Sequence, residues 1–338
     1  MNILFTCAGR RNYLINYFKE ALKGQGSVFT SDMQLSAPAM VDADQAFLVS
    51  SIYHKDYINE LIEIIKSNNV TAIISLNDLE LPILSENIKA IEDAGAKLIV
   101  SNMNVIDIAF DKVLTSEFLN EIGLKTPKTF TNLEVVVKML DQKEIQFPLV
   151  VKPRWGSASI GIDFPKDKEE LELSFRLQHK RLRETILSNA SEQDIDNAIL
   201  IQEKMDGNEY GMDILNDFEG NYIGSFVRQK LAMRAGETDK AISVIDERFE
   251  QLGRQISTNL KHIGNLDCDV FVVNDDLYVL ELNPRFGGGY PFSHEAGINT
   301  PAIYIDLLKG SKDIGKHINY KAGMMFSKCD RLIDVNNK

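Results

Sequence analysis

Acidic and amide side chains lie two residues apart near the end of a predicted β-hairpin. Glu281 and Asn283 are two residues apart on a predicted strand (277–282), so both point to the same face of it. The strand before it carries Asp267 and Asp269, which share one parity, and either could add a third oxygen from across the hairpin. Carboxylate and amide oxygens suit Mg²⁺. A metal site is the favoured interpretation, and a surface hairpin with scattered acids is the alternative.

A second set of residues could hold a phosphate group. Lys152 ends a predicted strand and is followed by a loop of small residues that includes Gly156, Ser157, Ser159 and Gly161. Such residues let backbone amides approach phosphate oxygens, and the lysine adds a positive charge. The loop is not a Walker A motif, because no Gly-Lys-Ser/Thr precedes a helix. A plain hairpin loop with a solvated lysine is the other interpretation.

Two further segments have a chemical interpretation. Arg285 follows the acidic strand and could stabilise a transferring phosphoryl group. The stretch Glu203-Lys204-Met205 ends another predicted strand and could offer backbone groups to an adenine edge, while Glu209 could accept from ribose hydroxyls. Taken alone, the stretch is better explained as an ordinary strand-turn-strand.

Strands and helices alternate through the first hundred residues, which predicts a parallel sheet covered on both faces. The predicted strands there are 3–6, 27–30, 70–76 and 96–100, and the predicted helices are 13–22, 58–65 and 83–94. Single helices are expected at 105–122 and 168–190. Later strands are hairpin-like, at 199–203, 209–216, 222–229, 267–273 and 277–282.

Composition narrows the class of protein. The chain has 338 residues, is 44% hydrophobic and carries a formal net charge of −12, which disfavours nucleic acids and membrane surfaces as partners. Three cysteines without metal-type spacing, and the absence of a secretory prefix, predict reduced thiols in the cytoplasm. No apolar run is long enough to span a membrane.

In this order the motifs resemble the ATP-grasp superfamily, from about residue 101 to 309. Lys112 and Lys152 match the family's ATP lysines, and the 156–161 stretch matches its phosphate-covering loop. The resemblance makes residues 203–205 the adenine segment and Glu209 the ribose acid. It also favours Asp269 over Asp267, which gives a metal triad of Asp269, Glu281 and Asn283, followed by Arg285.

The resemblance implies a fold and a domain plan. We expect a Rossmann-like, parallel-sheet pre-ATP-grasp domain at 1–100 and an ATP-grasp domain at 101–310, with a C-terminal extension at 311–338. The ATP-grasp part would have subdomains at 101–198 and 199–310. The wider pattern is similar to stand-alone proteins described as carbamoyl-phosphate-synthase large-subunit-like, although this chain has one ATP-grasp unit instead of two.

The implied activity is an ADP-forming ligation of a carboxylate to an amine through an acyl phosphate, with ATP and Mg²⁺ (two ions, or Mn²⁺) as cofactors. Lys152 and Arg285 would be catalytic, and Lys230 could also reach a phosphate. The small-molecule carboxylate and amine would lie near the residues Arg10, Arg11, Asp78, Glu80, Arg234 and Gly288. Each of the charged ones could equally be a surface charge or a helix cap, and the glycine could serve only a tight turn. A homodimer is common in this superfamily.

Two other functions fit parts of the sequence. The opening strand-helix pattern is also typical of nicotinamide-dependent oxidoreductases, but its first turn, Ala8-Gly9-Arg10-Arg11, lacks the G-x-G-x-x-G pattern. A catalytically silent, ATP-binding regulatory protein is the second alternative. The intact Lys112, Lys152, Glu281, Asn283 and Arg285 argue against it.

Overall fold

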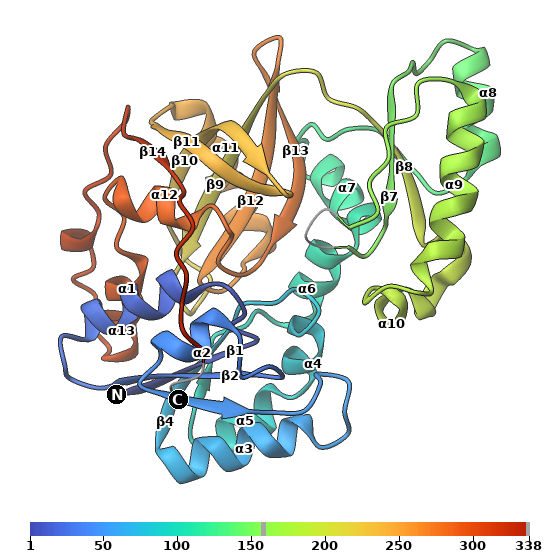
Figure 1. Cartoon of the computed structure of the whole chain (residues 1–338). Helices are drawn as coiled ribbons and strands as arrows, with labels where there is room; N and C mark the ends of the chain where they lie inside the picture. The colour runs from blue at the N-terminus through green and yellow to red at the C-terminus, as the bar shows by residue number, and fades with distance from the viewer. Residues whose placement is uncertain (157–159, 336–338) are drawn as a thin grey trace.

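The computed structural model describes residues 1–156 and 160–335. Its N-terminal part is a parallel sheet with strand order β3-β2-β1-β4-β5, which lies at the bottom of Figure 1. The strands are β1 (Asn2–Thr6), β2 (Ser27–Asp32), β3 (Gln45–Leu48), β4 (Val70–Ser75) and β5 (Lys97–Leu98). The helices that accompany them are α1 (Asn12–Leu22), α2 (Pro38–Asp42), α3 (Tyr57–Asn68), α4 (Leu81–Glu86) and α5 (Ile88–Asp93). The predicted parallel sheet is confirmed.

A small lobe on the right of Figure 1 is built on a sheet with strand order β6-β8-β7. These strands are β6 (Thr129–Phe130), β7 (Leu149–Pro153) and β8 (Ile199–Glu203), and they pair antiparallel. Helices α8 (Leu133–Asp141), α9 (Lys168–Leu182), α10 (Ser188–Ser191) and the 3-10 turn η1 (Glu192–Asn197) complete the lobe. Its core contains the buried Trp155, which packs with apolar residues of β7 and β8.

The remaining residues build an antiparallel sheet with strand order β13-β12-β9-β10-β11-β14. The strands are β9 (Asn208–Asn216), β10 (Tyr222–Arg234), β11 (Glu237–Val244), β12 (Asn265–Val273), β13 (Asp276–Asn283) and β14 (Met325–Ser327). Helix α11 (Glu247–Leu260) packs on this sheet through Phe249, Leu252 and Ile256. Helices α12 (Tyr290–Glu295) and α13 (Thr300–Leu308) and the 3-10 turn η2 (Gly315–His317) follow the last hairpin strand.

Three predicted helices differ in the structure. Residues 105–122 form two helices, α6 (Met103–Phe110) and α7 (Lys112–Glu121), because Asp111 leaves helical geometry and accepts hydrogen bonds from Val113 N and Leu114 N. Residues 83–94 likewise divide into α4 and α5 at Asn87. The helix predicted at 168–190 ends at Leu182.

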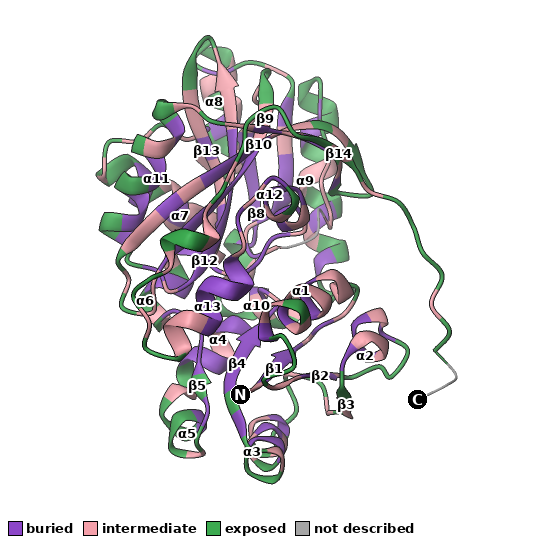
Figure 2. Cartoon of the chain, turned by 90° about the vertical axis from the view of Figure 1, so that its left-hand side faces the viewer, coloured by how far each residue is buried: buried purple, intermediate pink, exposed green. Residues whose placement is uncertain are grey.

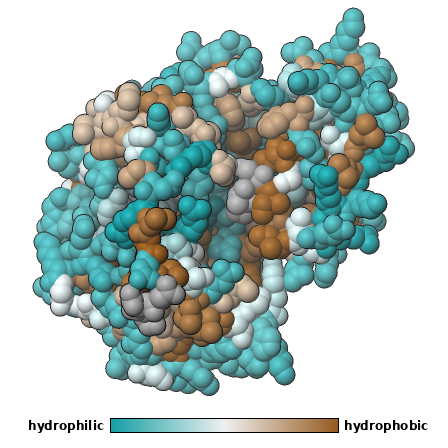
Figure 3. All heavy atoms as spheres, viewed as in Figure 1, coloured by the Kyte–Doolittle hydropathy of each residue, from teal (hydrophilic) through white to brown (hydrophobic). Residues whose placement is uncertain are grey.

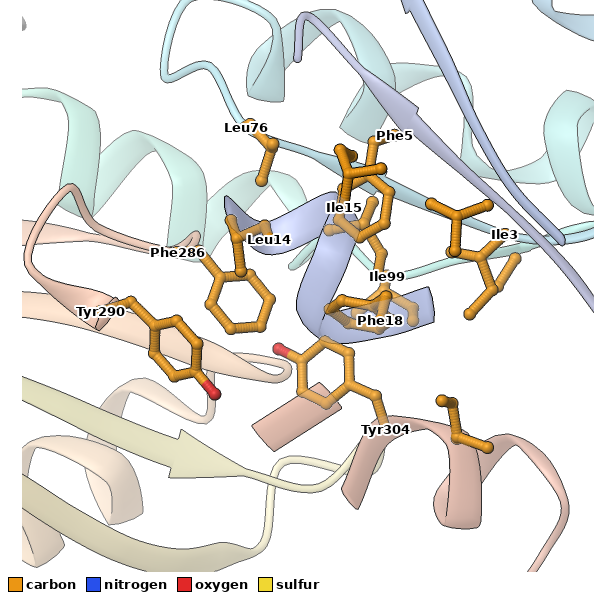
Figure 4. Packing of buried hydrophobic residues seen from close by; sticks show 14 of the residues in the cluster. Ile3, Phe5, Leu14, Ile15, Phe18, Leu76, Ile99, Phe286, Tyr290 and Tyr304 are labelled. Carbon is orange, nitrogen blue, oxygen red and sulfur yellow. The ribbon is translucent and has the colours of Figure 1, made fainter. Parts of the chain in front are cut away.

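The N-terminal sheet and the large antiparallel sheet share one hydrophobic core. Phe5 and Phe18 from β1 and α1 pack with Phe286, Tyr290 and Tyr304 from the C-terminal half of the chain (Figure 4). The Phe286 ring centroid lies 4.8 Å from that of Tyr290 and 5.4 Å from that of Tyr304. This shared core fixes the N-terminal sheet against the end of the β12-β13 hairpin.

The segment after β14 runs along the exposed outside of the molecule toward α2 (Figure 2). Arg331 there donates to the Asp42 carboxylate at the end of α2, at 3.1 and 3.3 Å. Within the described residues, no helix is both long and apolar enough to cross a membrane.

Candidate active site

A cavity of about 590 Å³ is lined by residues from the small lobe, the large sheet and the loop after β1. Figure 3 shows the corresponding hollow between the body of the molecule and the small lobe, with apolar residues along the lobe's side. Among the sequence-predicted site residues, those that line it are Arg11, Lys112, Lys152, Gly156, Glu203, Lys204, Met205, Glu209, Lys230, Asp269, Glu281, Asn283, Arg285 and Gly288.

Two lysines form the cationic wall of the cavity. Lys152 lies on β7 and is only 6% exposed, while Lys112 is the first residue of α7 and donates to the Gly156 carbonyl at 2.7 Å. Burial, together with the charge of Lys112, lowers the pKa of Lys152 to about 8, although Glu281 and Asp269 oppose the shift. A buried amine that is crowded by another cation is a good site for a polyanion, because an anion relieves both effects.

Acidic residues of the β12-β13 hairpin form the opposite wall. Asp269 pairs with Glu281 across the two strands, and Asp267 pairs with Asn283. The Asn283 amide nitrogen donates to Glu281 Oε1 at 3.3 Å. Burial and the charges of Asp267, Glu281 and Glu209 raise the pKa of Asp269 to about 7, against the lowering effect of Lys230. Burial is the largest cause of this raised pKa and the neighbouring carboxylates add to it, so a bound cation would lower the pKa of Asp269.

The side chains of Asp269, Glu281 and Asn283 fit a hard cation. Two carboxylates and an amide are oxygen donors of the kind that Mg²⁺ takes. Nowhere in the described ranges do three or more His, Cys, Asp or Glu side chains converge as a metal-binding group, so the third donor would be the amide of Asn283. The Lys230 ammonium lies 2.8 Å from Asp269 Oδ1 and 2.6 Å from Glu209 Oε1, so its single positive charge is shared between the two acids.

The structure separates the environments of Asp267 and Asp269. Asp267 accepts from Arg228 at 2.8 Å and from Arg285 at 3.3 Å, in a buried charge network that also contains Asp213. Asp269 faces Lys230 and Glu281 instead. Asp267 is thus a counter-ion for arginines, which leaves Asp269 as the better candidate for a metal.

Arginines from distant segments meet at the end of the cavity below the hairpin. Arg285 donates to Asp78 at 2.8 Å, which joins the loop after β13 to the loop after β4. Arg11 donates through Nη1 to the carbonyls of Leu76 and Phe286, at 2.7 and 2.8 Å. Both guanidinium groups also line the cavity, so this end is suited to an anionic group such as a carboxylate.

The segment between β8 and β9 forms another wall. Residues 202–207 all line the cavity, and apolar side chains around them include Val150, Ile160, Ile162, Phe164, Phe271 and Leu280. The Glu203 carboxylate accepts from the Lys128 backbone at 3.0 Å, so it braces the segment from behind. Gly207 is required there, because an added Cβ would lie 2.2 Å from the Val272 carbonyl oxygen.

Other predicted residues lie elsewhere. Glu80 is fully buried beneath the N-terminal sheet's edge and accepts from Thr6, Ser75 and Tyr57, at 2.8, 2.6 and 2.5 Å. Glu80 was predicted to contact substrate because it follows β4. Its side chain instead points into the interior of the N-terminal domain, at the ends of β1 and β4. Arg234 pairs with Asp330 at 2.7 Å. Arg234, Arg10 and Gly161 are not among the cavity-lining residues, Asp78 lines a smaller adjoining pocket, and Ser157 and Ser159 lie outside the described residues.

Sequence reasoning named Lys230 and Arg234 on β10 but missed the residues at the tip of the β10-β11 hairpin. Its tip brings Met233, Ala235, Gly236, Glu237 and Thr238 to the cavity. The turn signal Arg234-Ala235-Gly236-Glu237 was present in the sequence, with positive φ at Ala235 and Gly236 in the structure. Because strand β11 was not predicted, this turn was not interpreted as the tip of a hairpin.

Comparisons with known proteins identify the family of this chain. The family model of the ATP-grasp domain matches residues 109–289, and that of the PylC-like N-terminal domain matches residues 3–99. The chain belongs to the ATP-grasp family, which confirms the resemblance seen in the sequence.

Relatives at the sequence level are ligases and synthases. The chain is similar to the carbamoyl phosphate synthase large chain of Campylobacter jejuni, with 26% identity over 259 residues, which is 74% of this chain and 22% of that one. It is also similar to the D-alanine–D-alanine ligase of Campylobacter lari, with 28% identity over 210 residues, which is 57% of this chain and 55% of that one. The chain therefore spans less than a quarter of the first relative and about half of the second.

Solved structures share the fold at low identity. The biotin carboxylase domain of the Hydrogenobacter thermophilus 2-oxoglutarate carboxylase, solved with MgADP and bicarbonate, matches with a TM-score of 0.72 and 17% identity, covering 94% of this chain and 72% of that one. The L-amino acid ligase of Bacillus licheniformis matches with a TM-score of 0.64 and 19% identity, covering 91% and 74%.

Proposed function

We propose that this protein is an ATP-dependent, ADP-forming ligase that joins a small carboxylate to an amine. The observation that carries the proposal is the cavity in which Lys112 and Lys152 face Asp269, Glu281 and Asn283. Its volume of about 590 Å³ is within the range of small-molecule sites. The sequence relatives include a ligase that, by its name, joins two D-alanine molecules.

The walls of the cavity suggest how ATP would lie. The apolar side chains around residues 202–207 would hold the adenine, and Glu209 would accept from the ribose. Lys112 and Lys152 would neutralise the phosphates. Asp269, Glu281 and Asn283 would hold Mg²⁺, which supplies charge neutralisation on the phosphate oxygens when bound. Lys230 would then move from Asp269 to a phosphate oxygen or remain on Glu209.

The reaction itself is mostly positioning and electrostatics. A carboxylate oxygen of the substrate bonds to the γ-phosphorus of ATP, the bond to ADP breaks, and an acyl phosphate forms. The amine then bonds to the acyl carbon, phosphate leaves, and the nitrogen loses a proton. Arg285, which is held by Asp78 and Asp267, would face the transferring group.

A coupled ADP-release assay over amino acids, hydroxy acids and amines tests the proposal. We expect ADP release with a matching substrate pair, and its loss by about 100-fold or more in Lys152→Ala and Glu281→Gln. Lys89→Ala and Glu250→Gln are matched controls. Each residue forms an exposed ion pair inside its own helix, Lys89 with Asp93 in α5 and Glu250 with Arg254 in α11. Unchanged turnover in either site variant would contradict the assigned roles.

Binding experiments separate the two alternative functions. A silent regulatory protein would bind MgATP without releasing ADP with any pair in the screen. An oxidoreductase would bind NAD(P) in preference to ATP in a calorimetric titration. The predicted homodimer and cytoplasmic location stay predictions.

A further inference from the structure

Glu237 places a carboxylate at the arginine end of the cavity. It is the first residue of β11, and the hairpin tip that carries it lines the cavity together with Arg11 and Gly288. A Cβ added to Gly288 would lie 3.5 Å from the Glu237 carboxyl carbon, so the Glu237 carboxylate lies directly beside Gly288. Glu237 is therefore close to the position expected for the substrate.

The positive partner of Glu237 comes from the C-terminal segment, not from the cavity wall. The Lys328 ammonium lies 3.1 Å from Glu237 Oε2, and 64% of the Glu237 side chain is exposed. Asp267 and Asp269, in contrast, are neutralised by the buried residues Arg228 and Lys230 of the wall itself. The Lys328 side chain is 23% exposed and its ammonium also lies 6.0 Å from the Phe292 ring centroid, but the exposed Glu237 carboxylate is open to solvent. Because ion pairs that solvent can reach contribute little to stability, the Lys328 ammonium can be exchanged for another one.

Charges around Glu237 favour a substrate with both signs. The charge of Lys328, with those of Arg11 and Arg10, lowers the pKa of Glu237 against the effect of burial, so the group is a carboxylate at neutral pH. The guanidinium groups of Arg11 and Arg285 line the same end of the cavity. An acceptor for an ammonium group and donors for a carboxylate thus lie in one small space.

We propose that Glu237 binds the protonated amino group of a substrate that also carries the reacting carboxylate, and that Lys328 occupies Glu237 until that amino group replaces it. The substrate class is therefore an amino acid or another amine-bearing carboxylate. This inference rests on the proposed function, since it places the substrate in the same cavity. The Lys328 ammonium thus competes with the substrate amino group for Glu237 and does not help to bind the substrate.

The C-terminal segment stays attached when the Lys328 charge is removed. Strand β14 pairs with β11, the Lys328 backbone nitrogen donates to the Asp239 carbonyl at 2.8 Å, and Arg234 pairs with Asp330 at 2.7 Å. None of these contacts uses the Lys328 ammonium. Lys328→Met is therefore a test of the charge alone.

The experiment measures ADP release with the twenty standard amino acids and with the deamino carboxylic acid that corresponds to each, always with the same excess of the amine that the coupled screen identifies as the acceptor. With the wild type, we expect an active amino acid to have a kcat/KM at least about tenfold above that of its deamino acid, the effect of one lost charged hydrogen bond. Glu237→Gln should raise KM for that amino acid and remove the difference. Lys328→Met should lower KM, and both variants should keep the KM for ATP.

The opposite signs of the two variants identify the role of Lys328. If Lys328 only held Glu237 in place, both variants would raise KM, and the exchange would be refuted. Lys89→Met is the matched control, because Lys89 forms an exposed ion pair with Asp93 on α5. Equal activity with the deamino acids, or an unchanged KM in Glu237→Gln, would overturn the recognition role.

Failure of this inference is distinct from failure of the proposed function. MgATP binding by calorimetry without ADP release from any amino acid would overturn the substrate class and leave the nucleotide site standing. Absence of MgATP binding would overturn the proposed function itself.

Discussion

Lys152 shows how a residue can be prepared for a polyanion by its surroundings. It is almost completely buried, and the charges that act on it are those of Lys112, Glu281 and Asp269. Its lowered pKa, about 8, means that the protein without a nucleotide holds this proton weakly. Triphosphate binding should strengthen that hold, because the anion stabilises the ammonium form.

We therefore predict proton uptake on nucleotide binding above pH 8. At pH 8.5 much of the free Lys152 is neutral, and binding of a non-hydrolysable ATP analogue should return its proton; the affinity should fall by up to about tenfold for each further pH unit. Below pH 7 this dependence should vanish, because the lysine is already charged. Calorimetry in buffers of different ionisation enthalpy measures the uptake. Lys152→Met should abolish it, and equal uptake in that variant would refute the assignment.

Residue parity predicted part of the site and could not predict the rest. Alternation along the strands was enough to place Glu281 and Asn283 on one face of the hairpin and to give Asp267 and Asp269 a common face, and the structure pairs these residues across the two strands. Alternation could not distinguish Asp267 from Asp269, because their difference comes from Arg228 and Lys230 on another strand. Glu80 was proposed to contact substrate because its position after β4 is typical of ligand-binding residues. Hydrogen bonds from Tyr57 and Thr6 instead hold its carboxylate in the core, and these distant partners could not be predicted from parity.

At the scale of elements, the break between α6 and α7 positions a lysine. Asp111 caps α7, and its carboxylate also accepts from Arg154 at 2.8 and 2.6 Å. Arg154 follows β7 closely, so this one acid ties the start of α7 to the strand that carries Lys152. Lys112, the first residue of α7, is thereby held against the loop at Gly156.

We expect Asp111→Ala to destabilise the protein by about 2–4 kcal/mol, because it removes a helix cap and one partner of a largely buried ion pair. It should also weaken ATP binding through the displacement of Lys112. Asp111→Asn is the matched control, since it retains the cap and loses the charge, and its loss should be smaller. Urea unfolding measures the free energies. Identical losses for the two variants would show that the cap contributes nothing.

Element boundaries failed where side chains act on the backbone at long range. The continuous apolar spacing of residues 105–122 predicted one helix, whereas Asp111 is drawn out of helical geometry by its cap bonds and by Arg154, 43 residues away in sequence. Strands β3, β11 and β14 were missed because they lie at or near sheet edges and carry exposed residues that weaken their apolar pattern. The strongly apolar strands β1, β4 and β8 were predicted well.

At the scale of the whole molecule, the core around Phe286 joins the two ends of the chain. Phe286 is 1% exposed and packs against Phe18, Tyr290 and Tyr304. It directly follows Arg285, and its carbonyl accepts from Arg11. The same packing therefore supports both the sheet arrangement and the arginine end of the cavity.

Phe286→Ala should cost about 3–5 kcal/mol, the usual cost of truncating a buried aromatic residue. Thermal unfolding of both the wild type and this variant should remain a single transition, because the N-terminal sheet and the large sheet share the affected core. Tyr53→Ala is the control, since that side chain is 44% exposed, and it should have little effect. Separate transitions for the two sheets would contradict the shared core.

The shared core limits how this architecture can be recombined. A chimaera that exchanges residues 1–100 with those of a relative would bring in foreign counterparts of Phe5 and Phe18 while retaining Phe286 and Tyr304, so its seam would be mismatched. Grafting must therefore include the loop after β13, α12 and α13 with the N-terminal segment, because Phe286, Tyr290 and Tyr304 all pack in this core. For protein engineering, the smallest unit that can be exchanged with its core intact therefore consists of segments that lie far apart in the sequence.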